Sequence, residues 1–265
     1  MAVVETERHG QIFIIRMNRP ERLNAMGREL MEALAEQWTL FRKDPDLEVA
    51  IFTGTGRGFC AGEDMKESLE EGSPTDPETT LDDPFMSQEL EKPVIAAING
   101  YAMGGGFMLV ERTDLRVASS NAIFEVSEAK RWLLGGYNHG TIANLPYPIA
   151  MEMALGFRFT AQRFYELGFL NRVVEPSKLI PTAMEMGEHL LTLPPAARVN
   201  TVHMMRQIRP DTTKQQDLLA DALHQHGDLS DRMESRAAFT EKRKPNFKGW
   251  VDPEDRHKMP SLKDF

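Results

Sequence analysis

Short apolar segments that alternate with segments of helical periodicity restrict the fold of this chain more than any other feature. The apolar runs at residues 11–17, 49–53 and 94–98 have the length and composition of β-strands. Between the first two, apolar side chains from 28 to 43 recur at helical spacing. This alternation predicts an α/β fold whose sheet is largely parallel and covered by helices. Two further strands are expected, at residues 115–118 and 122–126.

The second half of the chain has a different character. After about residue 193 the pattern is mainly helical as far as residue 247, and a polar, proline-containing tail follows. We therefore predict a core at residues 1–193 and a helical region at residues 194–265. Residues 67–84 are acidic, rich in proline and without clear periodicity, which predicts a surface loop.

Charge and cysteine content exclude several classes of protein. The net charge of −9 argues against a surface that coats nucleic acid. No apolar run approaches the roughly 20 residues that cross a bilayer, and the start of the chain lacks the pattern of a signal peptide. The single cysteine, Cys60, excludes an internal disulfide framework, and no metal site is predicted. We expect a cytoplasmic protein without a nucleic-acid or membrane partner.

Basic side chains between residues 231 and 248 form a local exception to the acidic balance. A basic patch on an acidic protein indicates a ligand that carries phosphate, or else a solvated helix face.

Glycine-rich segments follow two of the predicted strands. Residues 58–66 follow the strand at 49–53, and the triplet Gly104-Gly105-Gly106 follows the strand at 94–98. Glycines that open a helix let backbone N–H groups approach a ligand, and the helix start adds partial positive charge. The expected guest is a phosphate or an oxyanion. The triplet has neither the spacing of a dinucleotide fingerprint nor the Gly-Lys-Ser/Thr of a phosphate loop.

Six segments, taken in order and spacing, resemble the crotonase (enoyl-CoA hydratase/isomerase) superfamily. They are residues 18–26, 58–67, 93–106, 124–128, 168–174 and 239–245. The resemblance implies a spiral ββα core with a C-terminal helical trimerisation region. It also implies a homotrimer or a dimer of trimers, in which helices of one subunit pack on another.

The same resemblance implies how a substrate binds. An acyl-CoA thioester is the expected substrate, its carbonyl oxygen held by the backbone N–H groups of Glu63 and Gly105. A glutamate at position 63 departs from the small residue usual there. Coenzyme A belongs to the substrate, so no separate cofactor is expected. Its predicted contacts are Arg22, Leu23, Ala61 and Met65. Phe239 and Lys242 are also expected to contact it, from the C-terminal helix of a neighbouring subunit.

The reaction is predicted from one departure. Hydratases of this family use two glutamates, and here Met108 stands at the first position and Glu128 at the second. Because methionine cannot transfer a proton, the resemblance favours an isomerase. Glu128 would then move a proton from C2 to C4 of an enoyl-CoA.

Other reactions and roles stay open. Glu111 lies one helical turn beyond Met108, and it supplies a second carboxylate, contacts a neighbouring subunit or faces solvent. His139, with Tyr137, acts as a base in hydrolysis or C–C cleavage, or is only a hydrogen-bonded loop residue. Hydration or dehydration of an enoyl-CoA is a further alternative. The last is a non-catalytic subunit that binds acyl-CoA.

Overall fold

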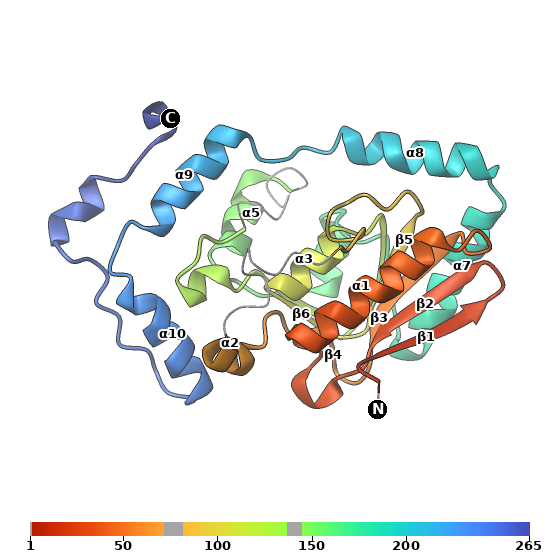
Figure 1. Ribbon diagram of the computed structural model, residues 1–265, viewed down its shortest axis with the longest axis horizontal. Coiled ribbons are helices and arrows are strands. Elements are labelled where there is room, and N and C mark those ends of the chain that lie inside the picture. The colour runs from red at the N-terminus through yellow and green to blue at the C-terminus, as the bar shows by residue number, and fades with distance from the viewer. Residues whose placement is uncertain (1, 72–81, 137–144) are drawn as a thin grey trace. The chain divides into compact units, whose positions relative to one another are not determined.

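The chain folds into two compact units, each built from two stretches of sequence. The computed structural model describes residues 2–71, 82–136 and 145–265. The first unit comprises Met1–Glu125 and Arg158–Arg209, and the second comprises Val126–Phe157 and Pro210–Phe265. Figure 1 traces the chain and labels its elements.

A six-stranded sheet forms the centre of the first unit, in the order β1-β2-β3-β5-β7-β10. Its strands are β1 (Val4–His9), β2 (Ile12–Met17), β3 (Val49–Gly54), β5 (Val94–Ile98), β7 (Leu115–Ser119) and β10 (Arg172–Val174). β1 pairs with β2 in antiparallel fashion, and every other pairing in this sheet is parallel. The edge strand β1 is mostly exposed, whereas β3 is buried along its whole length.

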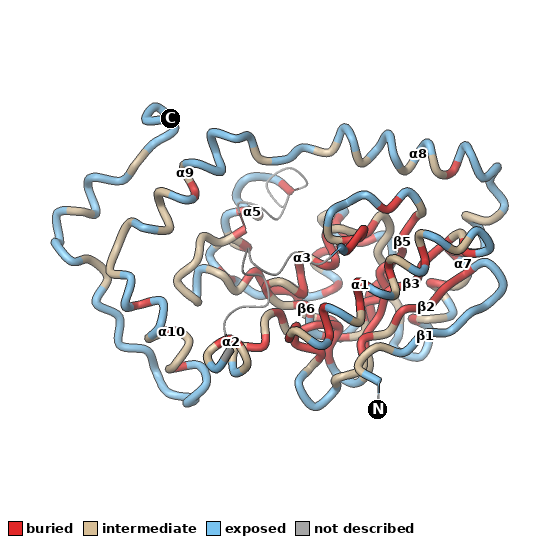
Figure 2. Tube along the Cα trace, in the orientation of Figure 1, coloured by how far each residue is buried: buried red, intermediate tan, exposed pale blue. Residues whose placement is uncertain are grey.

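Helices cover both faces of this sheet. Ile12 and Ile14 pack in one core with Leu179 and Ala183 of α7 (Leu179–Leu191). Phe13 points to the other face, where its ring stacks on Phe41 of α1 (Arg28–Lys43) with centroids 6.2 Å apart. Successive side chains of a strand point to opposite faces, so β2 is apolar throughout because both of its faces are covered. Figure 2 shows buried residues concentrated in these central strands.

A second, four-stranded sheet in the same unit has the order β4-β6-β8-β9. Its strands are β4 (Gly58–Cys60), β6 (Tyr101–Met103), β8 (Ile123–Glu125) and β9 (Phe159–Thr160). Along the chain, a strand of the large sheet is followed by a strand of the small sheet and then by a helix. β3, β4 and α2 (Met65–Glu71) follow this order, as do β5, β6 and α3 (Gly105–Glu111). This repetition is the expected ββα spiral.

The remaining elements of the first unit complete its surface. They are η1 (Pro20–Arg22), α6 (Ala161–Glu166), η3 (Pro176–Lys178) and α8 (Pro195–Gln207). Two arginines hold α8 to the unit. Arg198 bonds Glu48 and the carbonyl of Leu190, and Arg206 bonds both carboxylate oxygens of Asp114 at 2.8 and 2.6 Å.

The second unit is mainly helical. It contains η2 (Glu128–Arg131), α5 (Tyr147–Ala154), α9 (Lys214–His224), α10 (Ser230–Thr240), η4 (Pro253–His257) and η5 (Leu262–Asp264). Within it, the hydroxyl of Ser235 on α10 donates to the carbonyl of Lys130 at 3.0 Å. The buried carboxylate of Asp231 accepts the backbone N–H groups of Lys248 and Gly249, which holds the tail against α10.

The predicted strands and the α/β class are confirmed, and α1 matches the predicted helix from 28 to 43. The prediction of a loop at residues 67–84 is wrong over its first part, because α2 continues to Glu71. The reason is local: the Asp64 carboxylate accepts the N–H of Glu67, and Ser68 is buried. The division of the chain into a core at residues 1–193 and a helical region at residues 194–265 stays a prediction. No helix in the described stretches is long and apolar enough to cross a membrane.

Candidate active site

Two loops of the first unit leave neighbouring parallel strands at the same edge of the small sheet. Residues 61–64 follow β4, and Gly104 follows β6 and leads into α3. The carboxyl ends of adjacent parallel strands lie side by side, so the topology brings the two predicted glycine-rich segments together. In Figure 1, β4 and β6 lie close to the starts of α2 and α3.

The backbones of these loops approach each other closely at Gly62 and Gly105. A Cβ on Gly62 would lie 2.7 Å from the carbonyl oxygen of Met103 and 3.4 Å from the nitrogen of Gly105. Gly62 also has a φ of +89°, which side chains of L-residues rarely permit. Glycine is therefore required at position 62 by both space and conformation.

A short parallel ladder fixes the peptide groups around Glu63. Met26 pairs with Glu63: its N–H donates to the Gly62 carbonyl at 2.7 Å, and its carbonyl accepts the Asp64 N–H at 2.9 Å. In such a pairing one residue bonds the two neighbours of its partner, and the partner's own N–H and C=O point away. The N–H of Glu63 therefore faces away from Met26.

The start of α3 is equally well fixed. The Gly104 N–H donates to the Glu125 carbonyl at 2.8 Å, and the Gly104 carbonyl accepts the N–H groups of Phe107 and Met108. Phe107 is fully buried and stacks on Phe169, which anchors the helix in the core. Gly105 is the first residue of α3, and the first N–H groups of a helix have no acceptor within it. An arrangement of this kind suits an oxygen that carries negative charge.

Four of the predicted coenzyme A contacts lie on two adjoining segments of the first unit. The Ala61 N–H donates to the Leu23 carbonyl at 3.0 Å, and Leu23 adopts a left-handed conformation with a φ of 52°. Arg22 precedes it and is exposed, and Met65 begins α2 four residues after Ala61. Arg22, Leu23, Ala61 and Met65 are thus brought together, and their role in binding stays a prediction.

Phe239 and Lys242, the other two predicted contacts, lie at the end of α10 in the second unit. The Phe239 ring is half exposed and lies under the guanidinium of Arg131 at 4.2 Å. Lys242 follows the helix and is exposed. Next to it, Arg243 is held by the carboxylates of Glu234 and Glu241. Part of the predicted basic patch is therefore neutralised by neighbouring acids, while Lys242 faces solvent.

Glu128 begins η2 in the second unit, three residues along the chain from the end of β8. The residue is half-buried, and its carbonyl accepts the N–H groups of Trp132 and Leu133. Met108 lies on α3 in the first unit, also half-buried. His139 and Tyr137 lie outside the described residues.

Glu111 does not face solvent, which removes one of its predicted alternatives. It is buried on the last turn of α3, and its carbonyl accepts a bond from the guanidinium of Arg116 at 3.0 Å. Arg116 is itself half-buried, and its burial lowers the pKa of its guanidinium to about 10, while the charge of Glu111 acts to raise it. The charge of Glu111 thus acts on Arg116, and its roles in catalysis or in contact with a neighbouring subunit stay predictions.

Cys60 lies on β4, immediately before the glycine loop. Burial raises the pKa of its thiol to about 12, although a hydrogen bond from Gly62 acts in the opposite direction. A thiol with so high a pKa stays protonated at neutral pH and is a poor nucleophile. The fully buried Cys60 therefore packs in the core and is not a candidate nucleophile.

Sequence inspection missed two ion pairs next to these loops. Arg19 pairs with Asp64 at 3.3 Å, and Arg158 pairs with the buried carboxylate of Glu125 at 2.8 Å. The partners are 45 and 33 residues apart. Their separation left no local signal, although Arg19 and Asp64 both belong to segments that carry the family resemblance.

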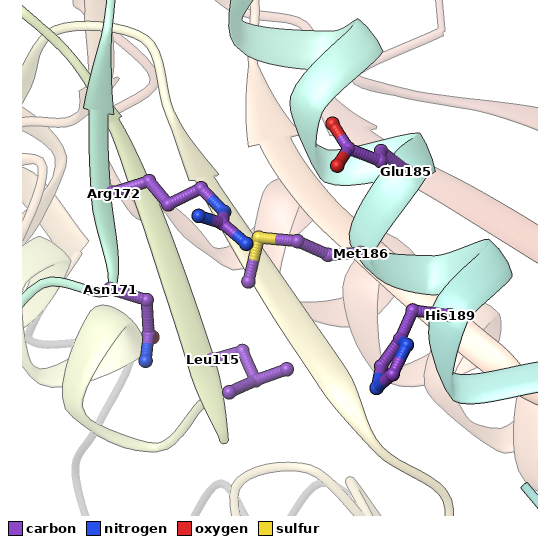
Figure 3. A pocket seen from close by; sticks show the side chains of 6 residues that line it. All are labelled: Leu115, Asn171, Arg172, Glu185, Met186 and His189. Atoms are coloured by element: carbon purple, nitrogen blue, oxygen red, sulfur yellow. The ribbon is translucent and has the colours of Figure 1, made fainter.

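A separate cavity of about 430 Å³ lies elsewhere in the first unit. It is lined by Leu115, Asn171, Arg172, Glu185, Met186 and His189 (Figure 3). Leu115 and Arg172 are the first residues of β7 and β10, and in Figure 3 the side chains of Arg172 and Met186 point toward one another. None of the predicted site residues in the described part of the chain lines this cavity, and its open, charged rim suits a solvent-filled hollow.

Comparison with known proteins decides the family. The profile described as "Enoyl-CoA hydratase/isomerase" matches residues 7–250. The chain belongs to the enoyl-CoA hydratase/isomerase family. Within this family it is 34% identical to the (E)-benzylidenesuccinyl-CoA hydratase of Thauera aromatica, over 93% of this chain and 99% of the relative. It is 33% identical to the enoyl-CoA hydratase EchA19 of Mycobacterium tuberculosis, with the same coverage of both chains.

Solved structures show the same fold. The crystal structure of carnitinyl-CoA hydratase from Mycobacterium avium superposes with a TM-score of 0.80 and 26% sequence identity. The match covers 94% of this chain and 99% of that one. The ββα spiral described above is therefore the crotonase fold, as the sequence predicted.

Proposed function

We propose that this protein binds an acyl-CoA thioester and stabilises its enolate with the N–H groups of Glu63 and Gly105. The observation that carries the proposal is the close approach of Gly62 to Gly105, which brings the two glycine-rich loops together at one sheet edge. Enolate formation moves negative charge onto the thioester oxygen, so fixed donors favour the transition state over the ground state. Loss of one such donor typically costs about 2.7–4 kcal/mol of activation free energy.

For the reaction, we propose the reversible addition of water to a 2-enoyl-CoA. Its support is that the similar proteins named above are hydratases, at 33–34% identity over nearly their whole length. Glu128 is the proposed acid and base. Its carboxylate accepts a proton from water as the oxygen of that water bonds to C3, and it returns a proton to C2 as the enolate collapses. One carboxylate then performs both transfers.

Isomerisation is a second candidate, because Met108 occupies the position of the first glutamate of the hydratase pair. With no second carboxylate to activate water, Glu128 would remove a proton from C2 of a 3-enoyl-CoA and return it to C4. The double bond moves from C3–C4 to C2–C3, and no water enters. Hydrolysis or C–C cleavage with His139, and binding without catalysis, remain outcomes of the test below.

Mass spectrometry of wild-type reactions distinguishes these functions. The protein is incubated separately with 2-enoyl-, 3-enoyl- and cyclic 3-oxoacyl-CoA thioesters. A product heavier by one water from the 2-enoyl thioester supports hydration, and an isomer of unchanged mass from the 3-enoyl thioester supports isomerisation. A product heavier by one water from the cyclic 3-oxoacyl thioester indicates C–C cleavage that opens the ring. Release of free coenzyme A indicates hydrolysis. If every thioester binds and none is converted, the protein is a binding subunit and the catalytic proposal fails.

Two variants assign the proton transfer. Glu128→Gln keeps the size of the side chain and removes the carboxylate, so turnover should fall by about 100-fold or more. Met108→Glu restores the missing carboxylate and should increase the hydration rate relative to any isomerisation. Glu36→Gln, an exposed residue of α1, is the control and should leave both rates unchanged. Turnover that survives in Glu128→Gln would contradict the assigned role.

A further inference from the structure

Arg19 and Asp64 form a mostly buried ion pair next to the proposed oxyanion donor Glu63. A guanidinium nitrogen of Arg19 lies 3.3 Å from an Asp64 oxygen, and the two side chains are 15% and 5% exposed. The other terminal nitrogen of Arg19 donates to the Ala25 carbonyl at 2.8 Å. The Arg19 side chain thus bonds both the Asp64 carboxylate and the Ala25 carbonyl.

These contacts enclose the short ladder that sets the direction of the Glu63 peptide. On one strand of the ladder, Ala25 precedes Met26; on the other, Asp64 follows Glu63. Arg19 bonds Ala25 and Asp64, and so it ties the two strands together beside the pairing of Met26 with Glu63. A shift of Asp64 would rotate the peptide group that carries the Glu63 N–H.

The backbone of Arg19 is in turn fixed by hydrogen bonds through Asn24. Its backbone N–H donates to the side-chain oxygen of Asn24 at 2.8 Å, and the Asn24 amide donates to the carbonyls of Thr55 and Gly58. Asn24 is fully buried in a left-handed conformation. The network therefore connects Arg19 to the beginning of β4, the strand from which the glycine loop departs.

We propose that Arg19 and Asp64 are positioning residues for the Glu63 N–H, an inference that rests on the proposed function. They act in two ways. The pair fixes the direction of the donor, and a misplacement of about 1 Å at a reacting centre can cost about 100-fold in rate. The Arg19 charge also neutralises the Asp64 carboxylate, which would otherwise lie one residue from a donor that binds a developing negative charge.

The two effects predict an order among variants. Asp64→Asn removes the carboxylate charge and keeps the size and the acceptor for the Glu67 N–H, so kcat should fall by about 10-fold. Arg19→Gln leaves that carboxylate uncompensated, so kcat should fall by about 100-fold. The double variant should recover to about the level of Asp64→Asn. KM should change by less than about 3-fold throughout, because the defect concerns the transition state.

A spectroscopic measurement reports the same effect without turnover. The absorption of a dimethylaminocinnamoyl thioester of coenzyme A moves to longer wavelength as its carbonyl oxygen gains negative charge. Wild type should produce this shift on binding, Asp64→Asn a smaller one and Arg19→Gln the smallest. Arg19→Lys keeps the positive charge but cannot bond two acceptors at once as the planar guanidinium does. Its wavelength shift should therefore lie between those of wild type and Arg19→Gln.

The ion pair of Arg206 with Asp114 provides a matched control. Its arginine is also 15% exposed, and the Asp114 carboxylate likewise accepts a backbone N–H, that of Val94. Arg206→Gln and Asp114→Asn should lower the melting temperature and leave both the wavelength shift and kcat unchanged. If wild type itself gives no shift, the proposed function is wrong. If wild type gives the shift and the variants of Arg19 and Asp64 reproduce it with unchanged kcat, only the positioning role is wrong.

Discussion

Gly62 is a residue at which both space and backbone conformation limit substitution. In Gly62→Ala the new methyl group would meet the Met103 carbonyl at 2.7 Å and would also have to accept a φ of +89°. The conformational cost alone is about 1–2 kcal/mol, and the clash should add about 1–3 kcal/mol. We expect a lower free energy of unfolding in urea, and turnover below the assay limit, because the two loops would separate.

Gly10→Ala is the matched control for this prediction. Gly10 also has a positive φ, +59°, but nothing lies within 4 Å of the position of its Cβ. This variant should lose only the conformational part of the stability, and its turnover should equal that of wild type. Equal losses of stability in the two variants would show that the contact between the loops contributes nothing.

The chemistry of individual positions was predictable from the sequence only where one local segment contains it. The glycines of both loops and Glu128 carry the family motif, so the resemblance indicates them directly, and their roles in the reaction stay predictions. The burial of Glu111 could not be predicted, because helical spacing places it on a face without saying what covers that face. The ion pair of Asp64 could not be predicted, because its partner, Arg19, lies 45 residues away in sequence.

At the scale of elements, α2 supplies a cap that α1 lacks. Gly27 is the N-cap residue of α1 and has no side chain to bond the first N–H groups of the helix. The carboxylate of Glu67 on α2 takes this role and accepts the Arg28 N–H at 2.6 Å. A Cβ on Gly27 would lie 2.1 Å from that carboxylate, so the glycine leaves room for the substitute cap.

Glu67→Ala should therefore lower the free energy of unfolding by about 1 kcal/mol, as the loss of an N-cap does. Adding Gly27→Ser should restore most of it, because the extended conformation of residue 27 suits a serine cap once the carboxylate is gone. Glu70→Ala, an exposed change on the same helix, is the control. Gly27→Ser that fails to rescue Glu67→Ala in urea unfolding would argue against this exchange of caps.

The elements that were predicted correctly are those whose buried side chains form a clear apolar pattern. β3 and β5 are buried on every residue and form continuous apolar runs, and α1 buries one apolar stripe at helical spacing, so both patterns are visible in the sequence. β1 was missed because its side chains are polar and mostly exposed, and it is held by backbone pairing with β2. α2 was missed because it begins from the side-chain cap at Asp64, and among its residues 65–70 only Ser68 is buried.

At the scale of the whole molecule, α8 has an unusual distribution of side chains. The inward side of α8 carries Arg198, which bonds the Leu190 carbonyl, and Arg206, which bonds the Asp114 carboxylate. Met204, Met205 and Ile208 are each more than half exposed, and Figure 2 shows α8 exposed along most of its length. A helix normally buries its apolar side chains and exposes its charged ones. Here the polar anchors face inward and the methionines face outward, so the outer side of α8 carries an exposed apolar patch.

A second copy of the chain is the expected cover, because the family resemblance implies a homotrimer or a dimer of trimers. Closed symmetric assemblies bury such side chains in every subunit at once. Sedimentation velocity should therefore report a mass of three or six chains for wild type. Met205→Glu combined with Ile208→Lys should shift the protein toward single chains, because charged groups are costly to bury in an interface.

Leu40→Glu tests whether this effect belongs to α8. Leu40 is also an exposed apolar residue, on α1, and it stands apart from other exposed large apolar side chains in sequence. Its substitution should leave the sedimenting mass unchanged, since a single exposed leucine is ordinary on a protein surface. A wild-type protein that sediments as one chain would leave Met204, Met205 and Ile208 in water. It would also show that Arg198 and Arg206 hold α8 in place without help from a neighbouring subunit.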